Sequence, residues 1–240
     1  MKITTVLFDL DGTLLPMEME SFLKAYFGGL TRRLAPCGYD PKELIGAIWA
    51  GTAAMVKNDG AETNEQVFWR ELAKHYGTKV TNDIPVFDAY YKQDFDSVAK
   101  SCGYTSDADR VIKLLKQNGM RTVLATNPLF PSIATQKRMK WAGLDANDFA
   151  LVTTYENSRH CKPNPAYYQD ILRTLGLSAE ECVMVGNDAD EDMIAETLGM
   201  RVFLLTDCLI NKSEADLSHY PQGGFDALFA FLEKFCTENR

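Results

Sequence analysis

The chain of 240 residues is predicted to be an α/β protein, built on a parallel sheet with helices on both faces. Two observations predict this fold class. Near the start, an apolar run ends abruptly in two acidic residues, as a buried strand does where it leaves a sheet. From residue 107 to residue 235, helical and strand patterns alternate, which is typical of parallel strands joined by right-handed crossovers. A purely helical block separates the two regions, and we interpret it as an insertion.

The first strand is predicted over residues 3–8, which are apolar and mostly β-branched or aromatic. Helices are predicted next, over residues 21–34, 41–60, 63–76 and 85–95. Pro41 can open the second of these helices, and Thr63 with Gln66 has the form of a capping box for the third. We expect the aromatic residues of this block to form mainly its core, with a minority lining a substrate pocket.

The rest of the chain is predicted to alternate between helix and strand. Strands are predicted over residues 121–125, 150–154, 182–185 and 201–205, and helices over residues 108–118, 131–141, 164–175, 192–198 and 225–235. Gly119, Gly176 and Gly199 follow three of these helices, at the position where glycine commonly ends a helix. The first strand is expected to join the same sheet, although the helical block separates it in sequence.

Composition narrows the functional classes. The formal net charge of −8 disfavours a nucleic-acid-binding surface, which needs clustered Lys and Arg, and it also disfavours adsorption to anionic membranes. The apolar run before Asp9 is too short for a signal peptide, and no stretch approaches the length of a transmembrane helix. The 6 cysteines are scattered without a C-x-x-C pair, so we expect a reduced, cytoplasmic protein.

Two carboxylates follow the first predicted strand in the sequence D-x-D-G-T. Asp9 and Asp11 would leave the carboxyl end of the strand, where ligands collect in α/β sheets, and Gly12 permits the turn that lets both approach one centre. Carboxylates this close repel each other unless a cation or proton lies between them, which favours a hard metal ion such as Mg²⁺. The alternative is an ordinary turn rich in Asp and Gly.

Polar residues follow later elements at the same expected edge. The hydroxyl, amide and backbone N–H groups of Thr126 and Asn127 could hold phosphate oxygens ahead of a helix, although Thr-Asn-Pro is also an ordinary turn. Lys162 lies in a loop stiffened by flanking prolines, and the alternative there is a solvated surface lysine. Asn187, Asp188 and the following acids come directly after the strand at 182–185; a cation would relieve their repulsion, and a helix dipole is the alternative.

The order of these segments, D-x-D-G-T, Thr-Asn, Lys-Pro and Gly-Asn-Asp with a further Asp, resembles the haloacid dehalogenase superfamily of phosphohydrolases over nearly the whole chain. This resemblance implies a Rossmann-like parallel sheet with a mobile cap. The helical block resembles the α-helical cap of the β-phosphoglucomutase and phosphoglycolate phosphatase branch. We therefore expect a catalytic core over residues 1–16 and 96–240 and a cap domain over residues 17–95, with hinges near residues 15–16 and 94–102.

The resemblance also implies roles for individual residues. Asp9 would be the nucleophile that becomes an aspartyl phosphate, and Asp11 would be the general acid and base. Thr126, Asn127 and Lys162 would bind the substrate phosphate, with Thr126 and Lys162 counted as catalytic. Mg²⁺ would be bound by Asp9, by Asp11 through its backbone carbonyl, and by an acid of the fourth segment.

The fourth segment departs from the commoner Gly-Asp form, because Asn187 follows Gly186. We choose Asp188 as the direct metal ligand, since an anion binds the metal better than an amide does. Asn187 and Asp192 are then neighbouring or outer groups.

The implied function is a Mg²⁺-dependent phosphomonoester hydrolase acting on a small phosphorylated metabolite. A phosphomutase, which would return the phosphoryl group to a sugar, is one alternative. A ligand-binding module without turnover is another, although the presence of Asp9, Asp11, Thr126, Lys162 and Asp188 argues against it. Sugar phosphates, nucleotides and phosphoglycolate all remain open as substrates, and the oligomeric state is undetermined.

Overall fold

A computed structural model describes residues 2–238 of the chain. Its centre is a parallel sheet of five strands in the order β2-β1-β3-β4-β5. The strands are β1 (Thr5–Phe8), β2 (Arg121–Leu124), β3 (Cys182–Gly186), β4 (Arg201–Leu205) and β5 (Gln222–Gly223). The first strand of the chain therefore lies inside the sheet, between two strands that come much later, as the sequence predicts. This placement confirms that the helical block is an insertion in a continuous α/β fold.

Both faces of the sheet are covered by helices. The core helices are α5 (Ser106–Gln117), α6 (Ser132–Trp141), α7 (Pro165–Leu175), α8 (Phe225–Glu238) and the 3-10 helix η6 (Met193–Leu198). Val6 and Phe8 of β1 belong to the apolar layer that includes α5 and α8, whereas Leu7 belongs to the layer of α7 and η6. Alternate side chains of a strand point to opposite faces, so the near-continuous apolar composition of β1 follows from burial on both sides.

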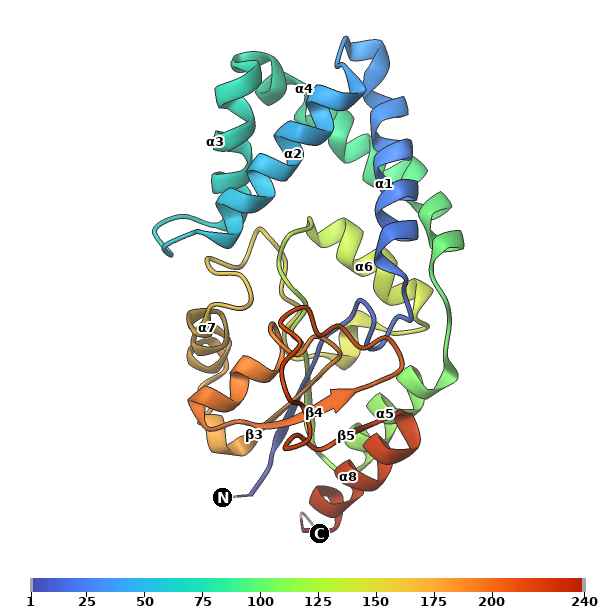
Figure 1. Cartoon of the computed structure of the whole chain (residues 1–240), viewed down its shortest axis with the longest axis vertical. Coiled ribbons are helices and arrows are strands. Elements are labelled where there is room, and N and C mark those ends of the chain that lie inside the picture. Colours follow the sequence, from blue (N-terminus) through green and yellow to red (C-terminus); the bar gives the residue numbers. More distant parts are fainter. Residues whose placement is uncertain (1, 239–240) are drawn as a thin grey trace.

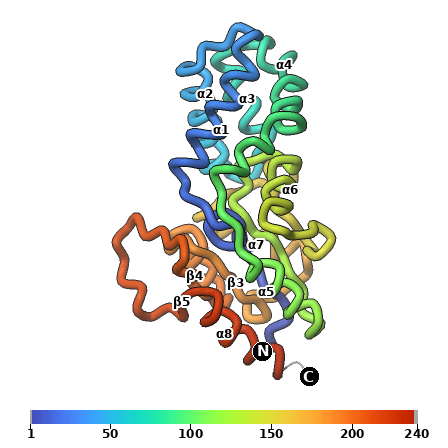
Figure 2. Tube along the Cα trace, turned by 90° about the vertical axis from the view of Figure 1, so that its right-hand side faces the viewer, coloured from blue at the N-terminus to red at the C-terminus, as the bar shows by residue number. Residues whose placement is uncertain are grey.

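The inserted block forms a helical layer beyond the carboxyl ends of the strands (Figures 1 and 2). Its helices are α1 (Met19–Leu34), α2 (Pro41–Val56), α3 (Asn64–Tyr76) and α4 (Thr78–Ala89), continued by a π-helical segment (Tyr90–Asp94) and a 3-10 segment (Phe95–Ser101). The capping box of Thr63 and Gln66 is present at the start of α3, as predicted. We call this layer, residues 19–101, the helical layer.

The helical layer is joined to the sheet region by two neighbouring chain crossings. Met17 forms an antiparallel bridge with Cys102, and the Gly103 amide donates to the Pro16 carbonyl at 2.7 Å. The chain segments that enter and leave the helical layer pair here, so the two predicted hinge regions lie side by side.

A second contact lies at the far end of the layer, in the loop between α2 and α3. The Asn64 amide donates to the Ser158 carbonyl at 2.9 Å, and the Asn64 side chain is fully buried against Cys161. The Arg159 guanidinium donates to the Ala61 carbonyl at 2.7 Å. The layer is thus fastened over the sheet at two separate points.

Several predicted elements differ from the structure at their limits. Pro85 lies inside α4, which begins at Thr78, because the residues after Gly77 already continue in helical conformation. The predicted strand at 150–154 is reduced to one parallel bridge between Val152 and Leu124. The segment at 193–198 is a 3-10 helix, and β5 has only two residues, too few for a recognisable sequence pattern. Within residues 2–238, no helix combines the length and apolar character needed to span a bilayer.

Candidate active site

The carboxyl ends of three adjacent strands bring the predicted segments together. Phe8, the last residue of β1, lies in register with Leu124 of β2 and Val185 of β3. Asp9 follows directly, and its amide donates to the Val185 carbonyl at 2.9 Å. Thr126 follows β2 at the same edge. Segments separated by more than a hundred residues in sequence therefore converge at one rim, as parallel pairing requires.

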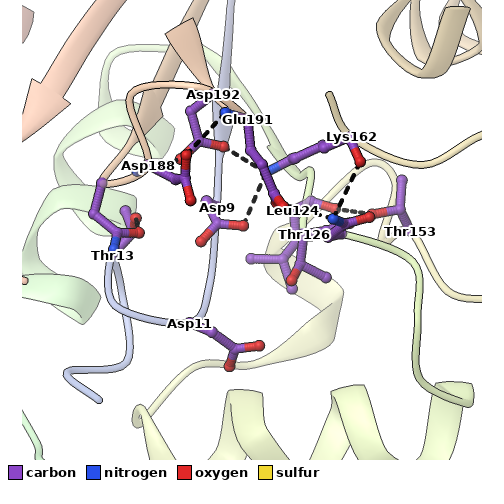
Figure 3. A network of polar contacts seen from close by, with 12 residues as sticks. Asp9, Asp11, Thr13, Leu124, Thr126, Thr153, Lys162, Asp188, Glu191 and Asp192 are labelled. Atoms are coloured by element: carbon purple, nitrogen blue, oxygen red, sulfur yellow. Dashed lines mark hydrogen bonds and ion pairs between the residues drawn. The ribbon is translucent and has the colours of Figure 1, made fainter. Parts of the chain in front are cut away.

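Lys162 reaches this rim from the loop before α7. Its Nζ donates to Asp9 Oδ1 at 2.9 Å and to Asp192 Oδ1 at 2.6 Å, and the side chain is only 1% exposed (Figure 3). Burial opposes the charge of Lys162, but Asp192 and Asp9 outweigh it and hold the lysine pKa well above its ordinary value. Lys162 is therefore a fixed, buried cation beside Asp9 and not a solvated surface lysine.

The fourth segment is held by hydrogen bonds to its own backbone. Asp192 Oδ2 accepts from the Asp188 amide at 3.0 Å, while its Oδ1 is occupied by Lys162. Burial raises the pKa of Asp192, and the charge of Lys162 counteracts this effect. Asp188 Oδ1 accepts from the amides of Asp190 and Glu191, both at 2.9 Å. Asp188 Oδ2 makes no hydrogen bond within the described part of the chain.

Asn187 ties the first and fourth segments together. Its Oδ1 accepts from Thr13 Oγ1 at 2.9 Å, and its Nδ2 donates to the Cys208 carbonyl at 2.7 Å. Gly12 has φ of +86°, and a Cβ there would lie 2.4 Å from Asn187 Nδ2. The glycine of D-x-D-G-T is thus required both by its backbone conformation and by the close approach of Asn187.

Asp11 is paired with an arginine that sequence reasoning missed. Arg138 of α6 is 1% exposed, forms an ion pair with Asp11 Oδ2, and lies over the Phe130 ring at 4.5 Å. Burial raises the pKa of Asp11 to about 6, and the Arg138 charge counteracts this effect. In Figure 3 the Asp11 carboxylate lies apart from the group formed by Asp9, Lys162, Asp188 and Asp192. Asp11 Oδ1 is buried and has no hydrogen-bond partner among residues 2–238.

Thr126 and Asn127 are positioned by different contacts. The Thr126 carbonyl accepts from Thr153 Oγ1 at 2.7 Å and from the Tyr167 hydroxyl at 2.9 Å, which fixes the turn after β2. The Asn127 amide nitrogen donates to Glu191 Oε2 at 2.9 Å, whereas Asn127 Oδ1 is buried with no hydrogen-bond partner in the described part of the chain. Both residues face the same cavity as Asp9.

A cavity of about 550 Å³ lies between the sheet edge and the helical layer. Asp9, Asp11, Asp188, Glu191 and Asp192 line its acidic floor. The helical layer supplies most of the remaining wall. The majority of the aromatic residues in the helical layer line the cavity. The expectation that only a minority of these aromatics line a pocket is therefore wrong: these rings pack on one another and also line the cavity.

The acidic floor has the chemistry of a site for a hard cation. Asp9 Oδ2 and Asp188 Oδ2 make no hydrogen bond within the described residues, and carboxylate oxygens are the ligands that Mg²⁺ prefers. No group of three or more His, Cys, Asp or Glu side chains suited to a metal is found within residues 2–238. Two carboxylates and a backbone carbonyl still fit Mg²⁺, which usually keeps several water ligands.

Two residues at the site carried no sequence signal for it. Arg138 is one of several basic residues in the helix predicted at 131–141, and nothing local indicates that it pairs with Asp11, 127 positions earlier. Glu191 is one of the acids that follow Asp188, for which a helix dipole is the alternative explanation; in the structure it lines the cavity and accepts a hydrogen bond from Asn127. Burial raises the Glu191 pKa.

Proteins of similar sequence are phosphatases by name. A phosphoglycolate phosphatase from Colwellia psychrerythraea is 28% identical over 228 residues, covering 95% of this chain and 94% of the relative. A ribulose-1,5-bisphosphate 5-phosphatase from Halopiger xanaduensis is 29% identical, covering 84% of each chain. A pyrophosphatase PpaX from Halalkalibacterium halodurans is 24% identical, covering 84% of this chain and 82% of the relative.

Solved structures share the fold along almost the full length. A predicted phosphoglycolate phosphatase from Haemophilus somnus has a TM-score of 0.61 at 17% identity, covering 97% of this chain and 99% of the other. The HAD-hydrolase YfnB from Bacillus subtilis, described as bound to magnesium, has a TM-score of 0.56 at 19% identity, with coverage of 97% and 99%. The family model of haloacid dehalogenase-like hydrolases matches residues 3–195. With that match across most of the chain, and with this fold and site, the protein belongs to the haloacid dehalogenase-like hydrolase family.

Proposed function

We propose that the protein is a Mg²⁺-dependent phosphomonoester hydrolase that acts on a small phosphorylated metabolite through an aspartyl-phosphate intermediate. The observation that carries this proposal is the environment of Asp9. One carboxylate oxygen is held by the buried Lys162, and the other is directed to a cavity without a hydrogen bond to the described residues. A carboxylate fixed in this way can attack phosphorus without first losing a partner.

In the first step, one oxygen of the Asp9 carboxylate forms a bond to phosphorus while the bond from phosphorus to the ester oxygen breaks. Lys162 offsets negative charge on Asp9 and on the transferring phosphoryl group. Asp11 gives a proton to the leaving alcohol oxygen; burial, which raises its pKa to about 6, keeps a protonated fraction available near neutral pH. Thr126 and Asn127 lie at the turn where they can hold phosphoryl oxygens.

In the second step, water attacks phosphorus and the bond from phosphorus to Asp9 breaks. Asp11, now ionised, takes a proton from that water, and inorganic phosphate leaves. Asp11 must separate from Arg138 to reach either proton, because the ion pair holds its carboxylate apart from Asp9 in this structure.

Mg²⁺ would be held by Asp9, by Asp188 and by the Asp11 backbone carbonyl. When bound, it would offset charge on the phosphoryl oxygens and orient them for in-line attack. The contacts of the neighbouring residues support Asp188 as the ligand of the fourth segment. Asp192 is occupied by Lys162 and the Asp188 amide, and Asn187 by Thr13 and Cys208, so both act by holding the ligands in place.

The phosphatase names of the sequence relatives support a phosphate ester as substrate. The domain division that we propose is a core of residues 1–16 and 96–240 and a cap of residues 17–95. The crossing at Met17 supports the first boundary, whereas the chain returns to the sheet region at Cys102, beyond the second boundary. A cytoplasmic location stays a prediction; within the described residues all 6 cysteines are free, as such a location would require.

The test is release of inorganic phosphate from 4-nitrophenyl phosphate, measured for the wild-type protein and for Asp9→Asn. We expect turnover with Mg²⁺, loss of turnover when a chelator removes the metal, recovery on adding Mg²⁺ back, and no turnover by a folded Asp9→Asn protein. Full activity of Asp9→Asn, or activity that the chelator leaves unchanged, would contradict the proposal.

A further inference from the structure

The cavity above Asp9 has an aromatic wall drawn from every helix of the helical layer. Rings from α1, α2, α3 and α4 face it, among them Phe22, Tyr26, Trp49, Phe68, Trp69 and Phe87. Neighbouring rings support one another: the centroids of Phe27 and Trp49 are 5.6 Å apart, and those of Trp69 and Phe87 are 5.1 Å apart. The wall is therefore a rigid apolar surface that is built in advance of any ligand.

Part of this wall is exposed. Trp49 is 46% exposed and Met19 is 42% exposed, and both line the cavity. Large apolar side chains of a folded protein are normally buried, and exposed ones that cluster at a cavity mark a binding surface. An apolar group of a ligand would be favoured against these side chains.

The hydroxyl groups of α1, α2 and the π-helical segment that line the wall are already paired. The Tyr26 and Tyr91 hydroxyls bond to each other at 2.9 Å, and Thr52 Oγ1 donates to the Ile48 carbonyl. Burial raises the pKa of Tyr26 to about 12, so this hydroxyl stays neutral. A substrate with several hydroxyl groups would find few open partners on the wall, and unpaired polar groups are costly to bury.

The charges around the cavity disfavour substrates that carry a second anionic group. Among the described residues that line the cavity, Lys212 is the single cationic side chain. Lys162 is already paired with Asp9 and Asp192, and Arg138 is already paired with Asp11. A second phosphate or a carboxylate on the substrate would therefore lie against an apolar wall and an acidic floor. Lys212 alone among the described lining residues could offset its charge.

From these observations we infer that the substrate is the phosphate monoester of an uncharged alcohol that carries one or two aromatic rings. This inference rests on the proposed function and narrows its substrate class. The phosphoryl group would lie on the floor at Asp9, and the ring system would pack against the aromatic wall. A cavity of about 550 Å³ lies within the usual range for such ligands. The relatives named for phosphoglycolate, ribulose bisphosphate and pyrophosphate would differ from this protein, because those substrates carry a second anionic group.

The experiment compares three substrates with matched alkyl leaving groups: 2-(1-naphthyl)ethyl phosphate, ethyl phosphate and 2-phosphoglycolate. Phosphate release is measured with Mg²⁺ present, and kcat/KM is determined for each. We expect the naphthyl ester to exceed both others by about 100-fold, from the burial of its rings. Equal or greater kcat/KM for ethyl phosphate or 2-phosphoglycolate would overturn the inference and leave the proposed function standing.

Trp49 provides the variant, because it is exposed and its loss should not unfold the protein. Trp49→Ala is expected to lower the naphthyl-to-ethyl preference by about 10-fold, and Trp49→Phe should retain most of it. Val56→Ala is the matched control, since Val56 is on the same helix, is 38% exposed and does not line the cavity. An unchanged preference in Trp49→Ala would contradict the assignment of the wall.

A binding measurement separates this inference from the proposed function. Calorimetry with the non-hydrolysable 2-(1-naphthyl)ethylphosphonate and with ethylphosphonate tests the wall without turnover. If no ester is hydrolysed, the proposed function fails, whereas tighter binding of the naphthyl compound still supports the aromatic wall. Equal binding of the two phosphonates overturns the inference whatever the activity.

Discussion

Lys162 is a lysine in a place where lysines are rare, 1% exposed and between two carboxylates. A buried charge is tolerated when its partners are fixed and complementary, and both conditions hold here. Its hydrogen bond to Asp9 leaves the second oxygen of that carboxylate open to the cavity. At the scale of single residues, the site is a carboxylate, our proposed nucleophile, held by one buried cation.

Replacing Lys162 tests this arrangement. In Lys162→Met the Asp9 and Asp192 carboxylates remain buried without their cation, so we expect a loss of about 3 kcal/mol in the free energy of unfolding. Urea denaturation measures it. Lys74→Met, which removes an exposed lysine paired with Glu71, serves as the control and should leave the unfolding midpoint unchanged. A Lys162→Met protein as stable as the wild type would show that the pair is not structural.

Arg138 yields a second prediction. Arg138→Gln removes the charge that counteracts the effect of burial on the Asp11 pKa, so less Asp11 is ionised to take the proton from water in the second step. We expect kcat for phosphate release to fall by about 10-fold, a part of the roughly 10²–10⁴-fold that general acid–base catalysis contributes. Arg138→Lys, which restores the charge, should recover part of the loss. Lys140→Gln, an exposed change in the same helix, is the control. If Arg138→Gln and Lys140→Gln have the same kcat, the charge of Arg138 does not tune Asp11 for catalysis.

Sequence reasoning located the residues that follow strands and missed those that arrive from helices. Asp9, Thr126 and Asp188 could be placed because parallel strands end at one edge, which makes position along the chain informative. Arg138 reaches Asp11 only through the packing of α6 against the sheet region, and no local pattern encodes that distance.

Single elements are positioned by a few close approaches. Gly186 ends β3, and a Cβ at this position would lie 2.0 Å from Asp192 Oδ2. The Asp192 carboxylate can therefore pack against the backbone of β3 only because residue 186 is glycine. The same packing explains why the fourth segment follows β3 without a spacer.

Gly186→Ala tests the approach. Asp192 would have to move, which would break its bonds to Lys162 and to the Asp188 amide; we expect phosphate release to fall at least about 10-fold and the free energy of unfolding to fall by about 1–3 kcal/mol. Gly28→Ala is the control, because nothing lies within 4 Å of a Cβ there. In an exposed helix, that change should stabilise the protein by about 0.5–1 kcal/mol. A neutral Gly186→Ala would mean that Asp192 is free to move.

Elements with strong periodicity were predicted closely, and those set by tertiary context were not. The helix at α3 was recognisable from its capping box, and β1 from its apolar run. The segment at 150–154 has a strand-like composition and runs beside β2, with the Ala150 and Thr153 amides donating to the Thr122 and Leu124 carbonyls, but it forms a single parallel bridge and no named strand. Pro85 suggested a helix start, yet α4 had already begun at Thr78.

At the scale of the whole molecule, the helical layer closes the cavity because it is fastened at two ends. One end is the pair of crossings at Met17 and Cys102, and the other is the loop before α3. At that loop the amides of Asn64 and Glu65 donate to the Ser158 and Tyr155 carbonyls, both at 2.9 Å. The contact at this loop is made by side chains and backbone groups that are distant in sequence. Its hydrogen bonds can therefore break while the chain crossings at Met17 and Cys102 stay in place.

Asn64→Ala should loosen this contact. The Asn64 side chain is fully buried and donates to Cys161 Sγ and the His160 carbonyl, at 3.3 Å each. Without it, we expect the amides of residues 64 and 65 to exchange hydrogen at least about 10-fold faster, while amides of β1 keep their protection. Asn147→Ala is the control, because Asn147 is exposed and lies outside the helical layer. Unchanged exchange at 64 and 65 would show that the backbone bonds alone hold the loop.

The most direct measurement of the central claim is detection of the phosphoryl group on the protein itself. The wild-type protein is mixed with a phosphate ester and Mg²⁺, quenched in acid within the first turnover, and its peptides are analysed by mass spectrometry. The account predicts a phosphoryl group on the peptide that contains Asp9, absent from Asp9→Asn. Phosphate release with the phosphoryl group on another residue, or an active Asp9→Asn protein, would contradict it.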